Sequence, residues 1–104
     1  AYLTIEPKQG SQVPVGVWEV SLTDEFRLDR YEGFPNFYYK KEIRIPVVDI
    51  RTGKTRQCDA FVYIMHEDKK LGVPTDMYVR TCIEGYRDFG FDPDFLLAAY
   101  DRSL

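Results

Sequence analysis

The sequence predicts an α+β domain, in which a small, mostly antiparallel β-sheet or β-barrel carries helices that are segregated from it. Segments rich in β-forming residues come in two pairs, each joined by turn residues, and segments with helical spacing follow each pair. Of the 104 residues, 44% are apolar and 30% are charged, which is typical of a soluble globular chain with one core. No linker or repeat divides the sequence, so we expect residues 1–104 to form a single domain.

The N-terminal third predicts a β-hairpin followed by a helix. The first strand, the turn and the second strand are expected at residues 2–6, 7–11 and 13–20. Ser21 or Thr23 can cap a helix over residues 24–31, whose acidic first turn suits the positive end of a helix. Gly33 is expected to end this helix in the left-handed conformation.

The middle of the chain predicts a second hairpin. Strands are expected at residues 38–50 and 56–65, joined by a turn at residues 52–54. Pro46 cannot donate a hydrogen bond to a neighbouring strand, so it indicates a sheet edge or a bulge. A polar loop is expected at residues 66–73.

Two further helices are expected towards the C-terminus. Thr75 is a candidate N-cap for a helix that ends at Gly90, while Asp92 and Pro93 suit the cap and the first position of another. Apolar side chains recur at helical spacing in the first of these two helices, at Tyr78, Val79, Cys82, Ile83, Tyr86 and Phe89.

Charge and cysteine content narrow the class of partner. The net charge of −3 and the lack of any basic run longer than two lysines argue against a nucleic-acid surface. No apolar stretch approaches the roughly 20 residues of a membrane span. Cys58 and Cys82 are interpreted as reduced thiols of a cytoplasmic protein rather than as a disulfide. The single histidine, His66, cannot anchor a usual zinc site, so no metal is expected.

The stretch LDRYEGFPNFYYKK, residues 28–41, holds the strongest candidate for chemistry. Glu32 stands directly before a glycine, at the negative end of the predicted helix and close to several aromatic residues. A negative helix end and an apolar setting favour the protonated form of a carboxylate, which suits a general base and acid near neutrality. The alternative is a solvated glutamate in the last helical turn.

Two tyrosines are candidates for orienting a substrate through their hydroxyls. Tyr38 opens the third predicted strand, and Tyr63 lies in the fourth. The alternative for both is ordinary strand packing. Lys40 and Lys41 are interpreted as a solvated face, and His66 as an exposed loop residue.

Four segments, in order, resemble the γ-glutamylcyclotransferase-like (AIG2-like) family. LDRYEG, followed by PNFYYKKEIRI, resembles the central signature of that family, which is LDxxEG and then a tyrosine that opens the next strand. A valine-glycine-tryptophan strand, the next core strand and the C-terminal helix of the family are similar to VPVGVWEV, AFVYIM and PTDMYVRTCIEGYRDFGFD. The resemblance covers nearly the whole chain and implies a β-barrel core around one cavity.

The resemblance also implies an enzyme that needs no cofactor and acts on a small molecule. The γ-glutamyl group of a dipeptide or of a γ-glutamylamine cyclises to 5-oxoproline, and the amine is released. The match to LDxxEG gives the acid-base role to Glu32 rather than to Asp29. Tyr38 and Tyr63 would contact the substrate, and we expect a cavity beside Glu32 and Tyr38. The identity of the leaving amine stays open.

One part of the family pattern has no counterpart in this sequence. The family begins with a Tyr-Gly-Ser-Asn type of loop, whose backbone amides hold the substrate and polarise its γ-carbonyl. Because Ala1-Tyr2-Leu3 resembles a later strand, we expect the sequence to be the C-terminal two-thirds of a complete domain or a natural short form. A short form would be a catalytically inactive binding module, or an enzyme completed by a separate N-terminal piece. Its open sheet edge would favour self-association or a partner strand.

Overall fold

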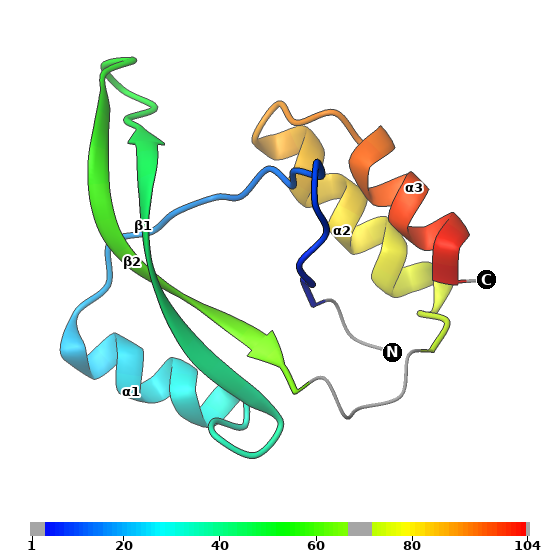
Figure 1. The fold of residues 1–104 in the computed structure, drawn as a ribbon, viewed down its shortest axis with the longest axis horizontal. Helices are drawn as coiled ribbons and strands as arrows, with labels where there is room; N and C mark the ends of the chain where they lie inside the picture. The colour runs from blue at the N-terminus through cyan, green and yellow to red at the C-terminus, as the bar shows by residue number, and fades with distance from the viewer. Residues whose placement is uncertain (1–3, 67–71, 104) are drawn as a thin grey trace. The chain divides into compact units, whose positions relative to one another are not determined.

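The computed structural model describes residues 4–66 and 72–103. In chain order, these residues form α1 (Leu22–Tyr31), β1 (Tyr38–Val48), β2 (Thr55–Met65), α2 (Asp76–Asp88) and α3 (Asp94–Ser103) (Figure 1). The two strands pair in antiparallel fashion and form an open sheet. The expected α+β class is confirmed, and within the described residues its β part is a sheet rather than a closed barrel.

The chain divides into two compact units. One unit contains α1 and the sheet, and the other contains α2 and α3 together with the segment Pro7–Gly16. All of the predicted site residues lie in the first unit.

The prediction of a hairpin near the N-terminus is wrong, because residues 4–20 contain no strand. Pro7 and Pro14 lack the N–H that a strand needs for pairing. A side chain takes the place of a backbone partner here, since Thr4 Oγ1 accepts a hydrogen bond of 2.9 Å from the N–H of Met65. The first two residues of the expected strand lie outside the described ranges.

The N-terminus of α1 is fixed by Ser21. Its side chain accepts a hydrogen bond of 3.1 Å from the N–H of Asp24, and the Asp24 carboxylate accepts one of 3.2 Å from the N–H of Ser21. This reciprocal pair satisfies two backbone donors that have no partner within the helix. Of the two caps that the sequence allows, Ser21 is therefore the one used, and Thr23 lies inside the helix.

The sheet is one long β-hairpin. Gly53 has a φ of +75°, and its N–H donates to the carbonyl of Asp49 at 2.8 Å, so the turn forms where the sequence predicts it. Pro46 pairs with Gln57 in an unbroken register. Among residues 4–66 and 72–103, β1 pairs only with β2, so Pro46 lies on an edge strand and not at a bulge.

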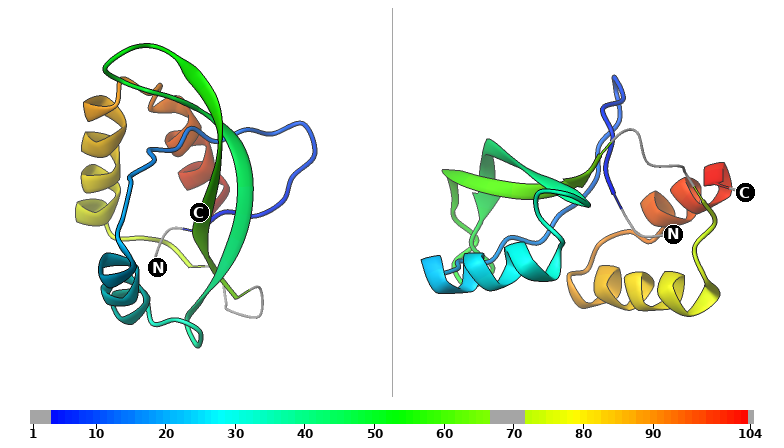
Figure 2. Two further views of the ribbon diagram at one scale, coloured as in Figure 1. Left: turned by 90° about the vertical axis from the view of Figure 1, so that its left-hand side faces the viewer. Right: turned by 90° about the horizontal axis from the view of Figure 1, so that it is seen from below.

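Residues that lie directly opposite each other in an antiparallel pair share one face of the sheet. The register thus defines a mixed face, which bears both charged and aromatic side chains. Its members are Tyr38, Lys40, Glu42, Arg44, Asp59, Phe61 and Tyr63. The other face is mostly apolar and includes Tyr39, Ile43, Ile45, Ala60, Val62 and Ile64. Figure 2 shows α1 on one side of the hairpin, and side-chain contacts place it on the mixed face.

Helix α2 is bounded by the residues that the sequence indicates. The Thr75 side chain caps its first turn. At the other end, the N–H groups of Gly90 and Phe91 donate to the carbonyls of Arg87 and Tyr86 at 3.0 and 2.8 Å. These two hydrogen bonds, together with a glycine in the left-handed conformation, satisfy carbonyls that the helix leaves unpaired. The rings of Tyr86 and Phe91 meet edge to face across the cap, with centroids 5.9 Å apart.

Helix α3 follows a short acidic cap. The carboxylate of Asp92 accepts a hydrogen bond of 2.9 Å from the N–H of Asp94, and Pro93 precedes the first helical residue. Leu96 of this helix is buried, with 7% of its surface exposed. The predicted cap and the predicted helix are confirmed.

Candidate functional site

The mixed face of the sheet is joined to α1 through Asp29. The Tyr63 hydroxyl donates a hydrogen bond of 2.5 Å to Asp29 Oδ1, although the two residues are 34 positions apart. Lys40 Nζ lies 2.9 Å from the same oxygen and donates to Oδ2 at 3.1 Å. The family signature favours Glu32 over Asp29 for chemistry, but Asp29 lies at the centre of a three-residue network with Tyr63 and Lys40.

Lys40 occupies a well-defined position between helix and sheet. Besides Asp29, its Nζ lies 3.5 Å from Glu25 Oε1, and only 19% of its side chain is exposed. The cation also lies over the rings of Phe34 and Phe61, at 4.9 and 5.3 Å from their centroids. Such contacts attract a cation to the face of a ring. Lys40 is thus not part of a solvated face, while Lys41, which points to the other face, is exposed as expected.

These contacts set the protonation states in the network. The hydrogen bond from Tyr63, followed by the one from Lys40, lowers the pKa of Asp29, so this carboxylate is ionised at neutral pH. The hydrogen bond to Asp29 raises the pKa of Lys40. Burial, and next the hydrogen bond to Asp29, raise the pKa of Tyr63 well above its ordinary value, so the hydroxyl keeps its proton.

Glu32 is held at the end of α1 by its backbone. It is the C-cap residue, and its N–H donates to the carbonyl of Leu28 at 2.8 Å. The next residue, Gly33, has a φ of +66° as the sequence predicts. The N–H of Phe34 then donates to the carbonyl of Asp29 at 2.9 Å, which closes the same type of cap as in α2. This turn gives the Glu32 backbone one defined position between α1 and β1.

The side chain of Glu32 is half-buried and is not engaged in a hydrogen bond or ion pair with any residue of the described ranges. Its negative charge makes a small contribution to the raised pKa of Tyr63, which burial and the hydrogen bond to Asp29 mainly cause. Glu32 also follows Asp29 by three positions, a spacing that places two helical side chains on one side. Glu32 and the Asp29 network therefore belong to one region.

Tyr38 lies at the start of β1 and has 8% of its surface exposed. Its ring meets that of Phe37 edge to face, with centroids 5.0 Å apart. Because Tyr38 pairs with Met65, Tyr63 is its diagonal neighbour on the mixed face. The structure thus brings the three predicted site residues, Glu32, Tyr38 and Tyr63, to the same end of the hairpin.

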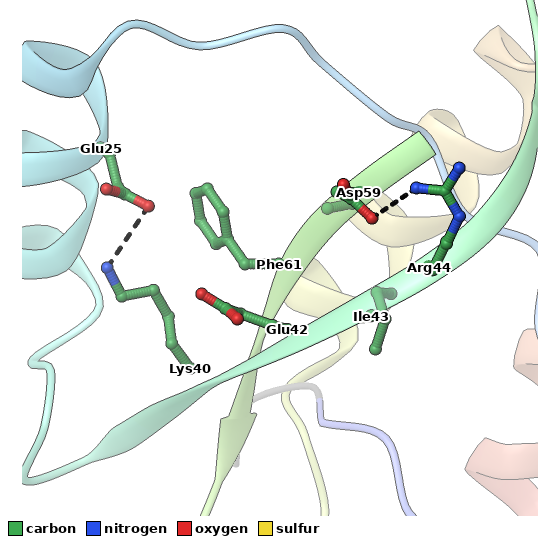
Figure 3. Close-up of a pocket in the computed structure, with 8 residues that line it drawn as sticks. Glu25, Lys40, Glu42, Ile43, Arg44, Asp59 and Phe61 are labelled. Carbon is green, nitrogen blue, oxygen red and sulfur yellow. Dashed lines mark hydrogen bonds and ion pairs between the residues drawn. The ribbon is translucent and has the colours of Figure 1, made fainter. Parts of the chain in front are cut away.

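An open groove of about 780 Å³ runs along the mixed face. Figure 3 shows the ion pair between Lys40 and Glu25 near one end and the pair between Arg44 and Asp59 at 2.7 Å near the other. The remaining lining residues are Glu42, Ile43, Ala60 and Phe61. The expected cavity beside Glu32 and Tyr38 is not this groove, since neither residue lines it. The groove begins instead at Lys40, the neighbour of Tyr63 across the sheet.

The remaining candidates have structural partners. His66 Nε2 lies 2.6 Å from the carbonyl oxygen of Pro35, and its ring lies against that of Tyr39. Cys58 and Cys82 are both free thiols and half-buried. In residues 4–66 and 72–103, no three histidine, cysteine or acidic side chains gather in a way that suits a metal ion. The same ranges contain no helix of sufficient length and apolarity to cross a membrane.

The pairing of Asp29 with Lys40 was not predicted, because the family signature favours Glu32 over Asp29 and a Lys-Lys pair is typical of a solvated face. The spacing of Glu25, Asp29 and Glu32 was the available signal, since residues separated by four and then three positions share one helix face. Three carboxylates on one helix face repel one another, so a nearby cation is expected to stabilise them, and Lys40 is that cation.

Comparison with known proteins agrees with this reading of the signature. The family described as "Gamma-glutamyl cyclotransferase, AIG2-like" matches residues 1–81, which include α1, the whole sheet and every residue of the candidate site. Searches of curated proteins and of solved structures found no match. The match covers well over half of the chain, so the protein belongs to the AIG2-like γ-glutamyl cyclotransferase family.

Proposed function

We propose that the protein cyclises the γ-glutamyl group of a small dipeptide or γ-glutamylamine to 5-oxoproline and releases the amine. In this reaction the α-nitrogen of the substrate attacks its own γ-carbonyl carbon. A new C–N bond forms, and the bond from that carbon to the leaving nitrogen breaks. The α-nitrogen loses two protons and the leaving nitrogen gains two, so a single carrier of protons suffices and no cofactor takes part.

Glu32 is the proposed carrier. An ammonium group cannot attack a carbonyl, so a base must first remove a proton, and the resulting acid can then protonate the leaving amine. The observation that carries this proposal is that Glu32 is a carboxylate on a rigid helix cap without a partner among the described residues. Asp29 and Glu25, by contrast, are engaged by Lys40. Of the three carboxylates on this face of α1, Glu32 is therefore the one that is available for a substrate.

Tyr38 and Tyr63 are proposed to contact the γ-glutamyl part, and the groove that begins at Lys40 would receive the amine part. Holding the α-nitrogen against the γ-carbonyl is itself a large share of catalysis, because it removes the entropic cost of ring closure. The two free cysteines support a reducing compartment such as the cytoplasm.

The test is the Glu32→Gln variant of the full natural polypeptide, assayed for 5-oxoproline release from a panel of γ-glutamyl dipeptides and γ-glutamylamines. Removal of a general base and acid should lower kcat by about 10²- to 10⁴-fold. Glu84→Gln, at an exposed position of α2, is the matched control and should keep full activity. Unchanged turnover in Glu32→Gln would remove Glu32 from the mechanism, and lack of turnover by the wild type would refute the proposed reaction.

A binding module of the same fold is the second candidate, and the open sheet favours it. Both β1 and β2 are edge strands within the described residues, and edges of this kind pair with further strands. If the protein is a binding module, the wild type should release no 5-oxoproline. It should instead self-associate or bind a strand of a partner. Sedimentation at several protein concentrations distinguishes a self-associating module from a monomeric enzyme.

A further inference from the structure

The Tyr63 hydroxyl has a fixed donor direction. A hydroxyl carries a single proton and two lone pairs, and Tyr63 directs its proton to Asp29 Oδ1 at 2.5 Å. An ionised carboxylate is only an acceptor, so the proton of this hydrogen bond comes from Tyr63. Towards any other group, the Tyr63 oxygen is consequently an acceptor.

Lys40 keeps this arrangement in place. Its Nζ contacts both oxygens of Asp29, which fixes the plane of the carboxylate. After the hydrogen bond from Tyr63, the hydrogen bond from Lys40 is the next cause of the lowered pKa of Asp29. The rings of Phe34 and Phe61 confine the cation in turn. Phe61 also packs edge to face against the ring of Tyr63, with centroids 5.6 Å apart, so the phenol itself is oriented.

We propose that Tyr63 accepts a hydrogen bond from the α-amine of the γ-glutamyl substrate, and that Asp29 and Lys40 are positioning residues that reserve its oxygen for this purpose. The inference rests on the proposed function. An α-ammonium group has three N–H donors, of which Glu32 would take one as base. An acceptor at Tyr63 would hold a second and aim the nitrogen at the γ-carbonyl. A Tyr63 that donated to the substrate would instead have to leave Asp29 without its partner.

The experiment compares two ligands that differ only in the α-amine. A γ-glutamyl methylamide carries this group, and glutaric acid monomethylamide has the same carboxylate and amide but hydrogen in its place. Affinities are measured by calorimetry in the Glu32→Gln background of the full polypeptide, in which turnover is suppressed. Tyr63→Phe should weaken binding of the γ-glutamyl ligand by about ten- to hundredfold, as expected for a lost hydrogen bond to a charged group, and leave the glutaryl ligand unchanged.

The positioning role is tested in the same background. Lys40→Met should remove the preference for the γ-glutamyl over the glutaryl ligand, and Lys40→Arg, which restores the cation, should recover it. Lys41→Met is the matched control, since Lys41 is the exposed neighbour on the other face of the sheet. Tyr31→Phe, at a tyrosine that is 85% exposed, controls for the loss of a hydroxyl. Both controls should keep the preference.

The outcomes separate this inference from the proposed function. If the wild type releases 5-oxoproline but Tyr63→Phe weakens both ligands equally, Tyr63 is only structural and the inference is overturned while the function stands. A Lys40→Met variant that keeps its ligand preference overturns the positioning role. If the wild type releases no 5-oxoproline and Glu32→Gln binds neither ligand, the proposed function fails and the inference fails with it.

Discussion

The Tyr63 hydroxyl and the Asp29 carboxylate join β2 to α1 through a hydrogen bond of 2.5 Å. This contact links β2, the strand that contains the AFVYIM segment, to the helix that carries LDxxEG. Because Glu32 lies three residues beyond Asp29 on the same helix, the contact also sets the distance between the proposed base and the sheet. The stability of this link should therefore affect both folding and activity.

The stabilisation that the ionised Asp29 gives to this link should be lost at acid pH. The pKa of Asp29 is lower in the folded state than its unfolded value of 3.8, first because of the Tyr63 hydrogen bond and then because of Lys40. A carboxyl of this kind stabilises the fold above pH 3.8, and the contribution is lost as the pH falls through the folded pKa. We expect the urea midpoints of the wild type and Asp29→Asn to differ at pH 7 and to converge below pH 3.8. A difference that stays constant down to pH 2 would contradict the assigned pKa direction, and the exposed Asp101→Asn variant serves as control.

The helix cap at Ser21 should contribute measurably to stability. Ser21→Ala removes the acceptor of the Asp24 N–H and should lower the free energy of unfolding by about 1 kcal/mol. Thr23→Ala is the matched control, because Thr23 is an exposed residue within α1 and alanine is the better helix former. Urea denaturation monitored by circular dichroism measures both variants. Equal effects of the two substitutions would mean that Ser21 is not the working cap.

The elements that the sequence predicts correctly are those that local signals specify. Ser21, Thr75, Gly33 and Gly90 act on backbone groups within a few positions of themselves, so residue type and spacing suffice to locate both ends of a helix. The hairpin around Gly53 is equally local. The prediction of an N-terminal hairpin failed because β-rich composition does not show whether a partner strand is available. In addition, two prolines in this segment oppose strand pairing.

The contacts within the candidate site could be predicted from the sequence only in part, because some of them join elements that are distant in the chain. The family resemblance proposes Glu32, Tyr38 and Tyr63 as site residues, but the Asp29–Lys40 pair depends on how α1 packs on the sheet. When two lysines are adjacent in a strand, the sequence indicates that both side chains are exposed to solvent. The register places Lys40 and Lys41 on opposite faces of the sheet, and the ion pairs of Lys40 with Glu25 and Asp29 show that its face is the one next to α1.

Helix α3 lies beyond the residues that the family match covers. Substitution of its buried leucine, Leu96, tests whether this helix packs as part of the fold. Leu96→Ala should cost about 2–5 kcal/mol, because it removes a side chain that is only 7% exposed. Leu97→Ala, at the next position with 40% exposure, should cost about 1 kcal/mol or less. Thermal and urea unfolding measure both. Similar small costs for the two variants would show that α3 packs weakly.

The turn after Glu32 should tolerate no side chain at Gly33. Its φ of +66° is strained for alanine, and a Cβ there would lie 3.1 Å from Phe37 Cβ, closer than ordinary contact. Gly53→Ala is the matched control, since Gly53 has a φ of +75° but nothing within 4 Å of an added Cβ. The left-handed backbone alone should cost about 1–2 kcal/mol in each variant, so any excess in Gly33→Ala reports the contact with Phe37. Because Glu32 directly precedes this turn, Gly33→Ala should also lower kcat, whereas Gly53→Ala should not. Equal unfolding free energies and equal kcat values for the two variants would mean that the turn at Gly33 does not hold Glu32 in place.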